Sequence, residues 1–411
     1  MIYKKLLDSP SDRFFFTGYF DRNIVNINNN YVLCHQVDFL NREPNCDDSV
    51  SIGYFDISQS TYTEVCRTYA WSWQVGAGLE WLDGRKFIYN TVVNKNNKPK
   101  IVAAVYDVFS KKVSISNHPV YCVSSSGKKY LSVDAISFSG RDGYDFKILS
   151  SDDVSNSSIP VSLVDSKDFS SEPLFSVSDV LSAYQNSVCQ KGRHYIDHLK
   201  FSDNDSKILF VHRWITENGE IFSNLAIYDL QEKQISIIYP GGRTTHSCWL
   251  SNDKILSWRG SSSRINLLRQ SGFSFISYLY RILIPIKALF PISIVKKAVG
   301  DALYLHDLNA DTVMIVKNIS VDGHPVGMHS VTNKFLIDTY EDNEGFRSLI
   351  LADVDSESNL LIDKIVSDPI SDNKSYRCDL HPKLSKDDKF IVIDHSENGG
   401  RGFRIYEKVS N

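Results

Sequence analysis

The sequence predicts an all-β fold, a seven-bladed β-propeller built from four-stranded antiparallel blades. Three observations predict it: a hairpin motif that recurs along the chain, a second recurring strand pair that follows it, and a high aromatic content. Aromatic residues make up 12% of the chain, with 21 Tyr and 22 Phe, and such side chains fit the pleated surface of a sheet. With two insertions set aside, the motif recurs about every 40 to 50 residues, the period of propeller blades. We count seven copies, with six or eight as alternatives.

The recurring hairpin motif contains a His, about four further residues, a polar turn that ends near a Lys, and an apolar β-rich run. Its clearest copies start at Asp197, Thr245, Gly323 and Leu380, and a fifth starts at Asn117. Weaker copies are GLEWLDGRKFIYNTVV from Gly78, which lacks the His, and FFFTGYFDRNIVNINNNYVLCHQV before it. Ser, Asp, Asn and Gly in the turns predict two strands joined as a hairpin.

A second strand pair follows most copies of the hairpin. In SNLAIYDLQEKQISIIY (Ser223 to Tyr239), an apolar run ends in Tyr-Asp-Leu, and a polar turn leads to an alternating strand. The same signature occurs in Lys100 to Ser116, Ala302 to Val316 and Arg347 to Asp363. These segments are predicted to form the third and fourth strands of each blade.

Two segments interrupt the repeat. Ser150 to Ser171 is rich in Ser and Asp and is predicted to be an excursion loop. Phe273 to Val295 is mostly apolar, but two basic residues and two prolines interrupt it. We therefore expect an apolar, amphipathic helical insertion at 264–300 within one blade of a single domain, 1–411. It is expected to lie on a membrane surface, on a membrane-bound partner or on the protein itself, because charged groups disfavour a true span.

Composition and charge exclude several classes of protein. The formal net charge is −4 and no run of Lys or Arg stands out, which argues against a nucleic-acid-binding surface. The seven cysteines are scattered and form no CxxC pair, so reduced thiols are favoured over a disulfide framework. The first residues lack an apolar stretch long enough for a secretory signal. We expect a cytoplasmic protein, with peripheral attachment at an inner membrane as the alternative.

The repeated histidines form a candidate site. If His198, His246, His324 and His381 occupy equivalent blade positions, they converge near the axis of the propeller, where His118 is a further candidate. A structural role, in which each His bonds the backbone of the next blade, is the alternative. Charged and polar residues flank the same motifs: Arg213, Asp338, Tyr340, Arg377, Asp379, Asp394 and His395. Such residues at the ends of apolar strands are costly unless they are paired or functional.

Several of these segments resemble a known family. DHLKFS…FVHRW, THSCWLSNDKILSW, DGHPVG…FLIDTYED and RCDLHPKLS…FIVIDHSENGGRGFRIY resemble bacterial seven-bladed propellers related to oligogalacturonate lyases, within the TolB- and WD40-like propellers. AWSWQVGAGLEWL and HPVYCVSSSGKKYLSVD look like the N-terminal blades of that group. The resemblance covers about residues 65–407. Many members belong to gene clusters for surface polysaccharides, and in the lyase branch histidines and a glutamine hold a divalent metal.

The resemblance implies roles for particular residues. His324 and His381 match the metal-ligand motifs; Cys378 stands where the glutamine is expected, so His395 or Asp379 is needed to complete the set. His246 matches the catalytic base, and Arg213 and Tyr340 would assist the substrate carboxylate or the leaving oxygen. The residues expected to bind substrate are Arg377, His198 and His212. Mn²⁺ is the expected ion, with Zn²⁺ and Ca²⁺ as alternatives.

Three functions follow from these roles. The first is a metal-dependent lyase that cleaves an acidic, uronate-containing oligosaccharide by β-elimination. The alternative is a non-catalytic propeller that binds a glycan or a protein in surface-polysaccharide biosynthesis, which a membrane-associated insertion at 273–295 would suit. A third is a hydrolase that uses two carboxylates from Asp338, Asp379 and Asp394.

Overall fold

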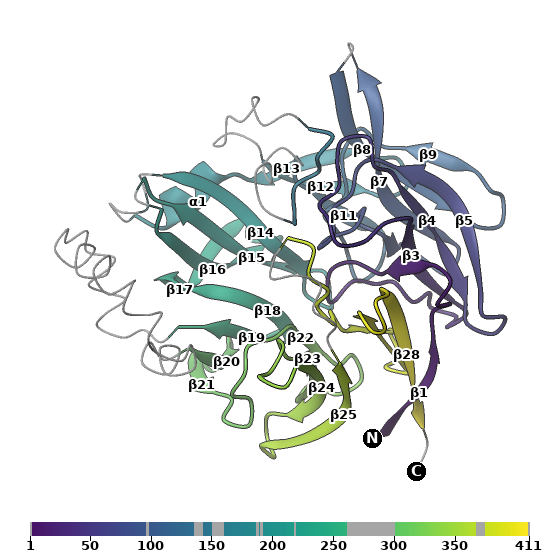
Figure 1. The fold of residues 1–411 in the computed structure, drawn as a ribbon. Helices are drawn as coiled ribbons and strands as arrows, with labels where there is room; N and C mark the ends of the chain where they lie inside the picture. The colour runs from purple at the N-terminus through teal and green to yellow at the C-terminus, as the bar shows by residue number, and fades with distance from the viewer. Residues whose placement is uncertain are drawn as a thin grey trace. The chain divides into compact units, whose positions relative to one another are not determined.

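The computed structural model describes residues 2–95, 98–134, 143–149, 160–185, 189, 192–217, 219–260, 301–366 and 375–409. Over these residues the chain forms 28 strands and one short helix, α1 (Val177–Ala183). The strands assemble into seven antiparallel sheets of four strands each (Figure 1). The predicted seven-bladed propeller is therefore confirmed.

Six blades each use four consecutive strands, paired in chain order. They are β2 (Phe14–Phe16), β3 (Tyr31–Val37), β4 (Val50–Asp56) and β5 (Thr61–Thr68); β6 (Glu80–Trp81), β7 (Lys86–Lys95), β8 (Lys98–Asp107) and β9 (Val113–Ile115); β10 (Cys122–Val123), β11 (Lys129–Ser132), β12 (Val161–Asp165) and β13 (Ser171–Phe175); β14 (Arg193–Phe201), β15 (Lys207–Ile215), β16 (Ile221–Asp229) and β17 (Gln234–Gly242); β18 (Thr244–Ser251), β19 (Lys254–Arg259), β20 (Ala302–Asp307) and β21 (Thr312–Ile315); and β22 (Pro325–Gly327), β23 (Lys334–Asp338), β24 (Phe346–Asp353) and β25 (Ser358–Val366). The recurring sequence motif thus corresponds to the first hairpin of a blade.

The seventh blade joins the two ends of the chain. Its first three strands are β26 (Lys383–Leu384), β27 (Phe390–His395) and β28 (Gly402–Val409), and its fourth is β1 (Ile2–Asp8). β1 runs antiparallel to β28, from the pair Ile2↔Val409 to the pair Asp8↔Arg404, and the two labels lie side by side in Figure 1. Sequence analysis did not assign β1 to a blade.

The chain divides into two compact units, and each is described by itself. The first comprises Met1–Ser155, Val161–Leu174 and Gly323–Asn411, and the second comprises Asn156–Pro160 and Phe175–Asp322. Five blades belong to the first unit, except for the last residue of β13. The blades β14–β17 and β18–β21, together with α1, belong to the second.

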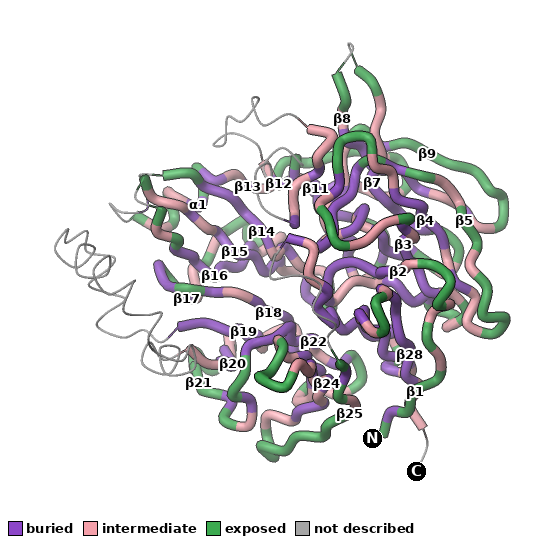
Figure 2. The backbone as a smooth tube through the Cα atoms, viewed as in Figure 1, coloured by how far each residue is buried: buried purple, intermediate pink, exposed green. Residues whose placement is uncertain are grey.

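The cores are aromatic and aliphatic side chains, many of them from the first three strands of the blades. β3, β15 and β19 are largely buried, whereas the fourth strands β9 and β21 are exposed throughout (Figure 2). In the first unit, the largest core cluster includes Trp71, Trp73 and Trp81, each 1% exposed. An outer strand with one face in water needs fewer apolar residues, in keeping with the exposure of these fourth strands.

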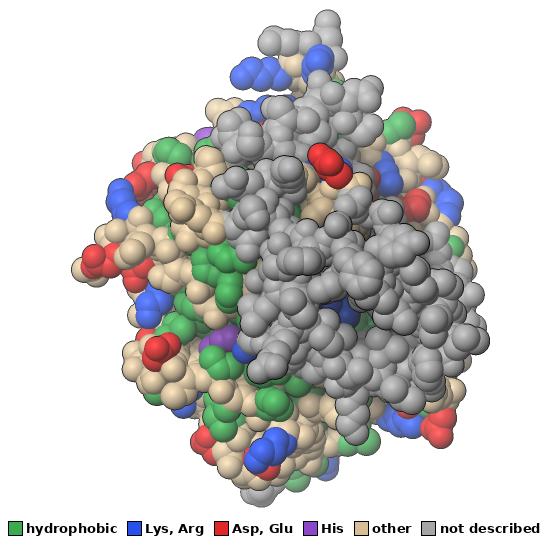
Figure 3. All heavy atoms as spheres, turned by 90° about the vertical axis from the view of Figure 1, so that its left-hand side faces the viewer, with side chains coloured by type: hydrophobic (Ala, Val, Ile, Leu, Met, Phe, Trp, Pro, Cys, Tyr) green, Lys and Arg blue, Asp and Glu red, His purple; other side chains and the backbone are tan. Residues whose placement is uncertain are grey.

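The predicted apolar insertion, 264–300, lies outside the described residues. The chain that contains it runs from β19 to β20, which pair with each other in one blade. Among the residues that are described, no helix has the length and apolar character that crossing a membrane requires. On the described part of the face in Figure 3, basic and acidic side chains are interspersed, as the small net charge suggests.

Candidate functional site

Three predicted metal-binding residues lie together in the first unit. One ligand atom each of His324, Asp379 and His381 lies within 4.8 Å of those of the other two. The three residues are 1%, 3% and 3% exposed. His324 directly precedes β22, and Asp379 and His381 lie a few residues before β26. The entrances to the first strands of two consecutive blades therefore build this group, as the recurrence of the His predicted.

Asp338, the last residue of β23, holds the two histidines in place. Its carboxylate accepts hydrogen bonds from the backbone N–H of His324 at 2.6 Å and from that of His381 at 3.1 Å. Both of its oxygens also lie 3.0 Å from Nδ1 of His324. Gly323 permits this approach, because a Cβ there would lie 1.8 Å from the carbonyl oxygen of Asp338.

The hydrogen bonds of the two imidazoles fix their tautomers. A carboxylate accepts only, so Nδ1 of His324 carries the proton and Nε2 carries the lone pair. Nδ1 of His381 lies 3.2 Å from the carbonyl oxygen of Gly18, which gives it the same tautomer. An acceptor behind a ligating imidazole is the usual second shell of a metal site.

The backbone of His381 is also unusual. Its φ is +44°, a left-handed conformation that residues with a Cβ adopt at a cost of about 1 to 3 kcal/mol and that concentrates at functional sites. The bond from its N–H to Asp338 helps to hold this conformation. In the second unit, His198, which occupies the related motif position, has φ +52°.

Two arginines keep Asp379 ionised. Nε of Arg377 lies 2.5 Å from one carboxylate oxygen, and a guanidinium nitrogen of Arg347 lies 3.6 Å from the other. Burial by itself would raise the pKa of Asp379, but the charges of Arg377, His324 and Arg347 outweigh it and the pKa is lowered. Two imidazoles, which bind a metal in their deprotonated form, and one carboxylate are a donor set that suits Mn²⁺ or Zn²⁺, so these residues fit a divalent metal.

Aromatic rings surround the two histidines. The predicted Tyr340 packs edge-on against His324, with ring centroids 5.7 Å apart, and the guanidinium of Arg377 lies 5.5 Å from the Tyr340 ring. Tyr19 packs against His381 at 5.1 Å and Phe20 against His324 at 5.0 Å. Tyr19 and Phe20 were not among the predicted site residues, although they follow Gly18 in the weakest copy of the motif.

His395 lies outside the three-residue group. Its Nδ1 is 3.3 Å from the carboxylate of Glu397, and burial, followed by the charge of Arg404, lowers its pKa. Of the two residues considered for completing the metal set, Asp379 is the one beside His324 and His381.

The carboxylates considered for a hydrolase have other partners. Asp394 accepts bonds from the backbone and the hydroxyl of Thr17 and lies 3.6 Å from Nζ of the fully buried Lys383. Asp338 is bonded to the two histidines and Asp379 to Arg377. These contacts favour support of a metal group over general acid–base work by two carboxylates.

A second group of predicted residues lies in the second unit. An N–H of Arg213 bonds Nε2 of His198 at 3.1 Å, and the rings of His198 and His246 are 5.9 Å apart. Nδ1 of His246 lies 3.4 Å from the carboxylate of Asp322. Arg213 also donates to the carbonyl of Thr244 at 3.2 Å. The structure thus brings together two predicted catalytic residues and one predicted to bind substrate. Their predicted convergence with His324 and His381 concerns two units and stays a prediction.

His212 belongs to a different cluster of the second unit. It is fully buried, and its Nε2 lies 3.0 Å from Nδ1 of His194. Burial, followed by the charge of the neighbouring His194, lowers its pKa to about 3. Full burial argues against the predicted contact of His212 with substrate.

His118, by contrast, is half-buried and belongs to neither histidine group.

Comparison with known proteins adds a fold relationship. No protein-family model matches the sequence, and no curated protein matches it. Among solved structures, an oligogalacturonate lyase in complex with manganese has a TM-score of 0.61 at 10% identity, covering 99% of this chain and 93% of that one. The shared property is the propeller fold.

Two further solved structures agree with this fold. The oligogalacturonate lyase of Vibrio parahaemolyticus also has a TM-score of 0.61 at 10% identity, with 98% of this propeller and 92% of that chain covered. The propeller domain of the Trilobed protease from Pyrococcus furiosus gives 0.51 at 10% identity, with 96% of both chains covered. Because a lyase and a protease domain share the fold, the function must be argued from the site.

Proposed function

We propose that this propeller is a metal-dependent, lyase-like enzyme that cleaves an acidic, uronate-containing oligosaccharide by β-elimination. The observation that carries the proposal is the buried group of His324, Asp379 and His381, with both imidazoles oriented by acceptors behind them. The fold likeness to a lyase solved with manganese supports it. In this proposal the three residues hold one divalent cation, Mn²⁺ or Zn²⁺.

A bound divalent cation would supply positive charge that neutralises a uronate carboxylate and acidifies the adjacent C–H bond. Arg377 can add to this effect. One of its N–H groups bonds Asp379, while the side chain remains 29% exposed, so further donors of the guanidinium fork can bind a carboxylate. We assign to Arg377 the binding of the substrate carboxylate.

Tyr340 is assigned to the leaving oxygen. Its ring contacts both His324 and Arg377, and the residue is only half-buried. A phenol can donate its proton to the glycosidic oxygen as the bond to carbon breaks. The departing sugar then leaves as an alcohol rather than as an alkoxide.

His246, in the second unit, is assigned as the base on the resemblance to the lyases, and its action on the same substrate as the first group is part of the proposal. The carboxylate of Asp322 holds the proton on Nδ1, which leaves the lone pair on Nε2. This lone pair would take the proton from the carbon next to the uronate carboxylate, and the electrons of that C–H bond would form the new C=C bond. Arg213, whose guanidinium is fixed by His198 and Thr244, would stabilise the negative charge that develops on the carboxylate.

The proposal is tested by activity measured with Mn²⁺ and acidic oligosaccharides, using the ultraviolet absorbance of the unsaturated uronate product. We expect this absorbance to rise with the unmodified chain and to be lost in His324→Ala and His246→Ala. His118→Ala is the matched control, since His118 lies outside both groups, and it should keep full activity. If Mn²⁺ neither binds nor raises the unfolding temperature, the metal-dependent reaction is wrong. Binding of oligosaccharide without any elimination would instead support the non-catalytic alternative.

A further inference from the structure

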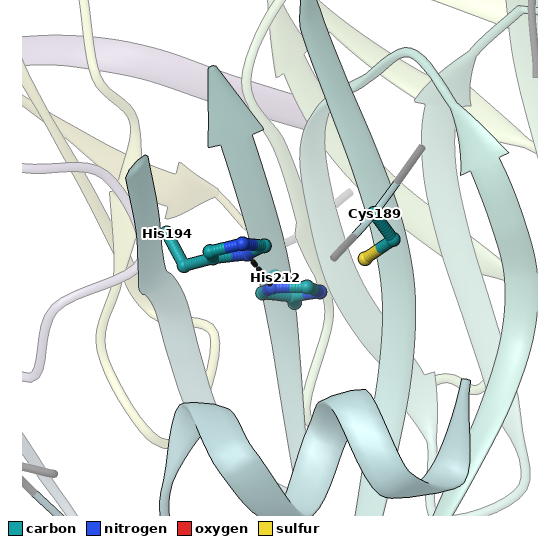
Figure 4. A group of neighbouring side chains, drawn as sticks. All are labelled: Cys189, His194 and His212. Atoms are coloured by element: carbon teal, nitrogen blue, oxygen red, sulfur yellow. Dashed lines mark hydrogen bonds between the residues drawn. The ribbon is translucent and has the colours of Figure 1, made fainter. Parts of the chain in front are cut away.

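A second cluster of metal-ligating side chains lies apart from the proposed site. One ligand atom each of Cys189, His194 and His212 lies within 4.8 Å of those of the other two (Figure 4). We propose that these three residues of the second unit form a second metal site, which takes a thiolate-binding ion such as Zn²⁺. The proposal does not depend on the proposed lyase activity.

The strand register places the two imidazoles on one face of their blade. His194 of β14 is paired with Trp214 of β15, and Ile196, two residues along β14, is paired with His212. His194 and His212 are thus diagonal neighbours, within reach of each other across a strand pair. Their rings are nearly parallel, at 9°, with Nδ1 of His194 3.0 Å from Nε2 of His212. Figure 4 shows His212 in the middle, with His194 on one side and the Cys189 sulfur on the other.

Cys189 lies just before β14, and its position depends on a turn. Gly192 has φ +132°, and a Cβ there would lie 2.3 Å from the carbonyl oxygen of Ile215. Only glycine permits this close approach directly before β14. Cys189 is 0% exposed and packs in an apolar cluster with Trp214 and Phe222.

The surroundings suit a closed metal site. His194 is 9% exposed and His212 is 0% exposed, and Trp214 stacks on His212 with ring centroids 5.4 Å apart. In a tetrahedral zinc site, ligand atoms lie roughly 3.5 Å from one another, given bonds of about 2.0 to 2.3 Å. Ligand atoms at most 4.8 Å apart would therefore need to approach by no more than about 1.3 Å, and the facing nitrogens of His194 and His212 are already 3.0 Å apart.

The choice of ion follows from the donors. One sulfur and two imidazole nitrogens are ligands that Zn²⁺ and Co²⁺ accept, whereas Mn²⁺ and Ca²⁺ prefer oxygen. The group of His324, Asp379 and His381 offers no sulfur. Binding at the second site would convert the Cys189 thiol to a thiolate, with its proton released to solvent.

Asn224 sets the tautomer of His212 in the metal-free protein. The backbone N–H of Gly241 donates to Oδ1 of Asn224 at 2.6 Å, so the amide nitrogen faces Nδ1 of His212 at 3.3 Å. His212 therefore accepts at Nδ1 and donates from Nε2 to His194. A metal ion would replace this Nε2 proton, the proton would move to Nδ1, and the Asn224 amide would have to turn over to accept it.

The site is tested by titrating the full chain with Co²⁺ alone, because a cysteine thiolate bound to Co²⁺ gives an intense near-ultraviolet charge-transfer band that imidazole and carboxylate ligands do not give. We expect one equivalent of this band in the unmodified chain, its loss in Cys189→Ser, and its retention in His324→Ala. Cys378→Ser is the matched control, since Cys378 is also buried but lies beside the first group. Circular dichroism would confirm that Cys189→Ser is folded. Absence of the band at saturating Co²⁺, or its persistence in folded Cys189→Ser, would overturn the site.

A second variant strengthens the site rather than removing it. In Asn224→Asp, a carboxylate can accept bonds from both Gly241 and Nδ1–H of His212, so the Nε2 lone pair becomes available without any turn of the side chain. Such second-shell changes alter metal affinity about 10- to 100-fold. We expect Co²⁺ to bind at least tenfold more tightly, with the same thiolate band. Unchanged or weaker binding would contradict the assignment of His212 as a ligand.

Discussion

At the scale of single residues, Asp338 determines whether the first group can hold a metal. It accepts the backbone N–H of both histidines and orients His324 through Nδ1. In Asp338→Asn, the amide nitrogen takes the place of one carboxylate oxygen. Because this nitrogen cannot accept a hydrogen bond, one of the N–H groups loses its acceptor. We expect the affinity for Mn²⁺ to fall about 10- to 100-fold, measured by calorimetric titration.

Asp388 provides a control for this prediction. It is also fully buried and also accepts two backbone N–H groups, those of His329 and Ser330, but it contacts neither histidine of the group. Asp388→Asn should therefore lower the free energy of unfolding and leave the affinity for Mn²⁺ unchanged. Equal loss of affinity in both variants would mean that Asp338 acts through general stability alone.

Sequence reasoning reached the residues of the first group because they repeat. His324 and His381 recur at one motif position, and Asp379 stands two residues from His381. Tyr19, Phe20, Cys189 and His194 belong to no recurring pattern, and their contacts arise from cross-strand register and from chain segments far apart in sequence. The role of Asp338 as a shared acceptor for both histidines was equally invisible, since it depends on the close approach at Gly323.

At the scale of elements, β1 completes the seventh blade. Tyr3 on this strand donates from its hydroxyl to the carbonyl of Asp388 at 2.6 Å, and Asp8 bonds Arg404 at 2.6 Å. Removing residues 1–8 would leave the edge of β28 unpaired and expose apolar surface beneath it. We expect the unfolding temperature to fall by several degrees, since about 1 kcal/mol corresponds to 2–4 °C in chains of 150–250 residues. Lys4→Ala, at an exposed position of β1, should leave the unfolding temperature unchanged.

The hairpins and the closing strand differ in how much the sequence reveals. A hairpin is local, so its turn residues and alternating pattern predict it from one short segment. The partner of β1 lies about 400 residues further along the chain. Apolar and polar residues alternate only weakly in β1, so its sequence does not predict which strand it pairs with. The fold class was therefore predictable from repeated local signals, whereas the closure was not.

At the scale of the whole molecule, buried neutral histidines make stability depend on pH. Burial lowers the pKa of His35 and that of His306 to about 3. Above pH 6.5 neither the folded nor the unfolded chain protonates them. Between pH 6.5 and 3 the unfolded chain takes up protons that the folded chain does not. As the pH falls through this range, each His therefore lowers the free energy of unfolding by about 1.4 kcal/mol per pH unit.

Urea unfolding from pH 7.5 to 4.5, with a chelator present, measures this dependence. His306→Gln should reduce the slope of the free energy of unfolding against pH by the equivalent of about one proton in this window. The reason is that the unfolded chain then has one fewer group that takes up a proton. An unaltered slope in His306→Gln would show that His306 is protonated in the folded state.

The pairing of β1 with β28 also has a consequence for biosynthesis. β1 is synthesised several hundred residues before β28, so during that interval the nascent chain carries this strand without its partner. Such edges invite pairing with other chains. We expect the charged side chains of Lys4 and Lys5, which are exposed on this strand, to disfavour its pairing with other chains during this interval.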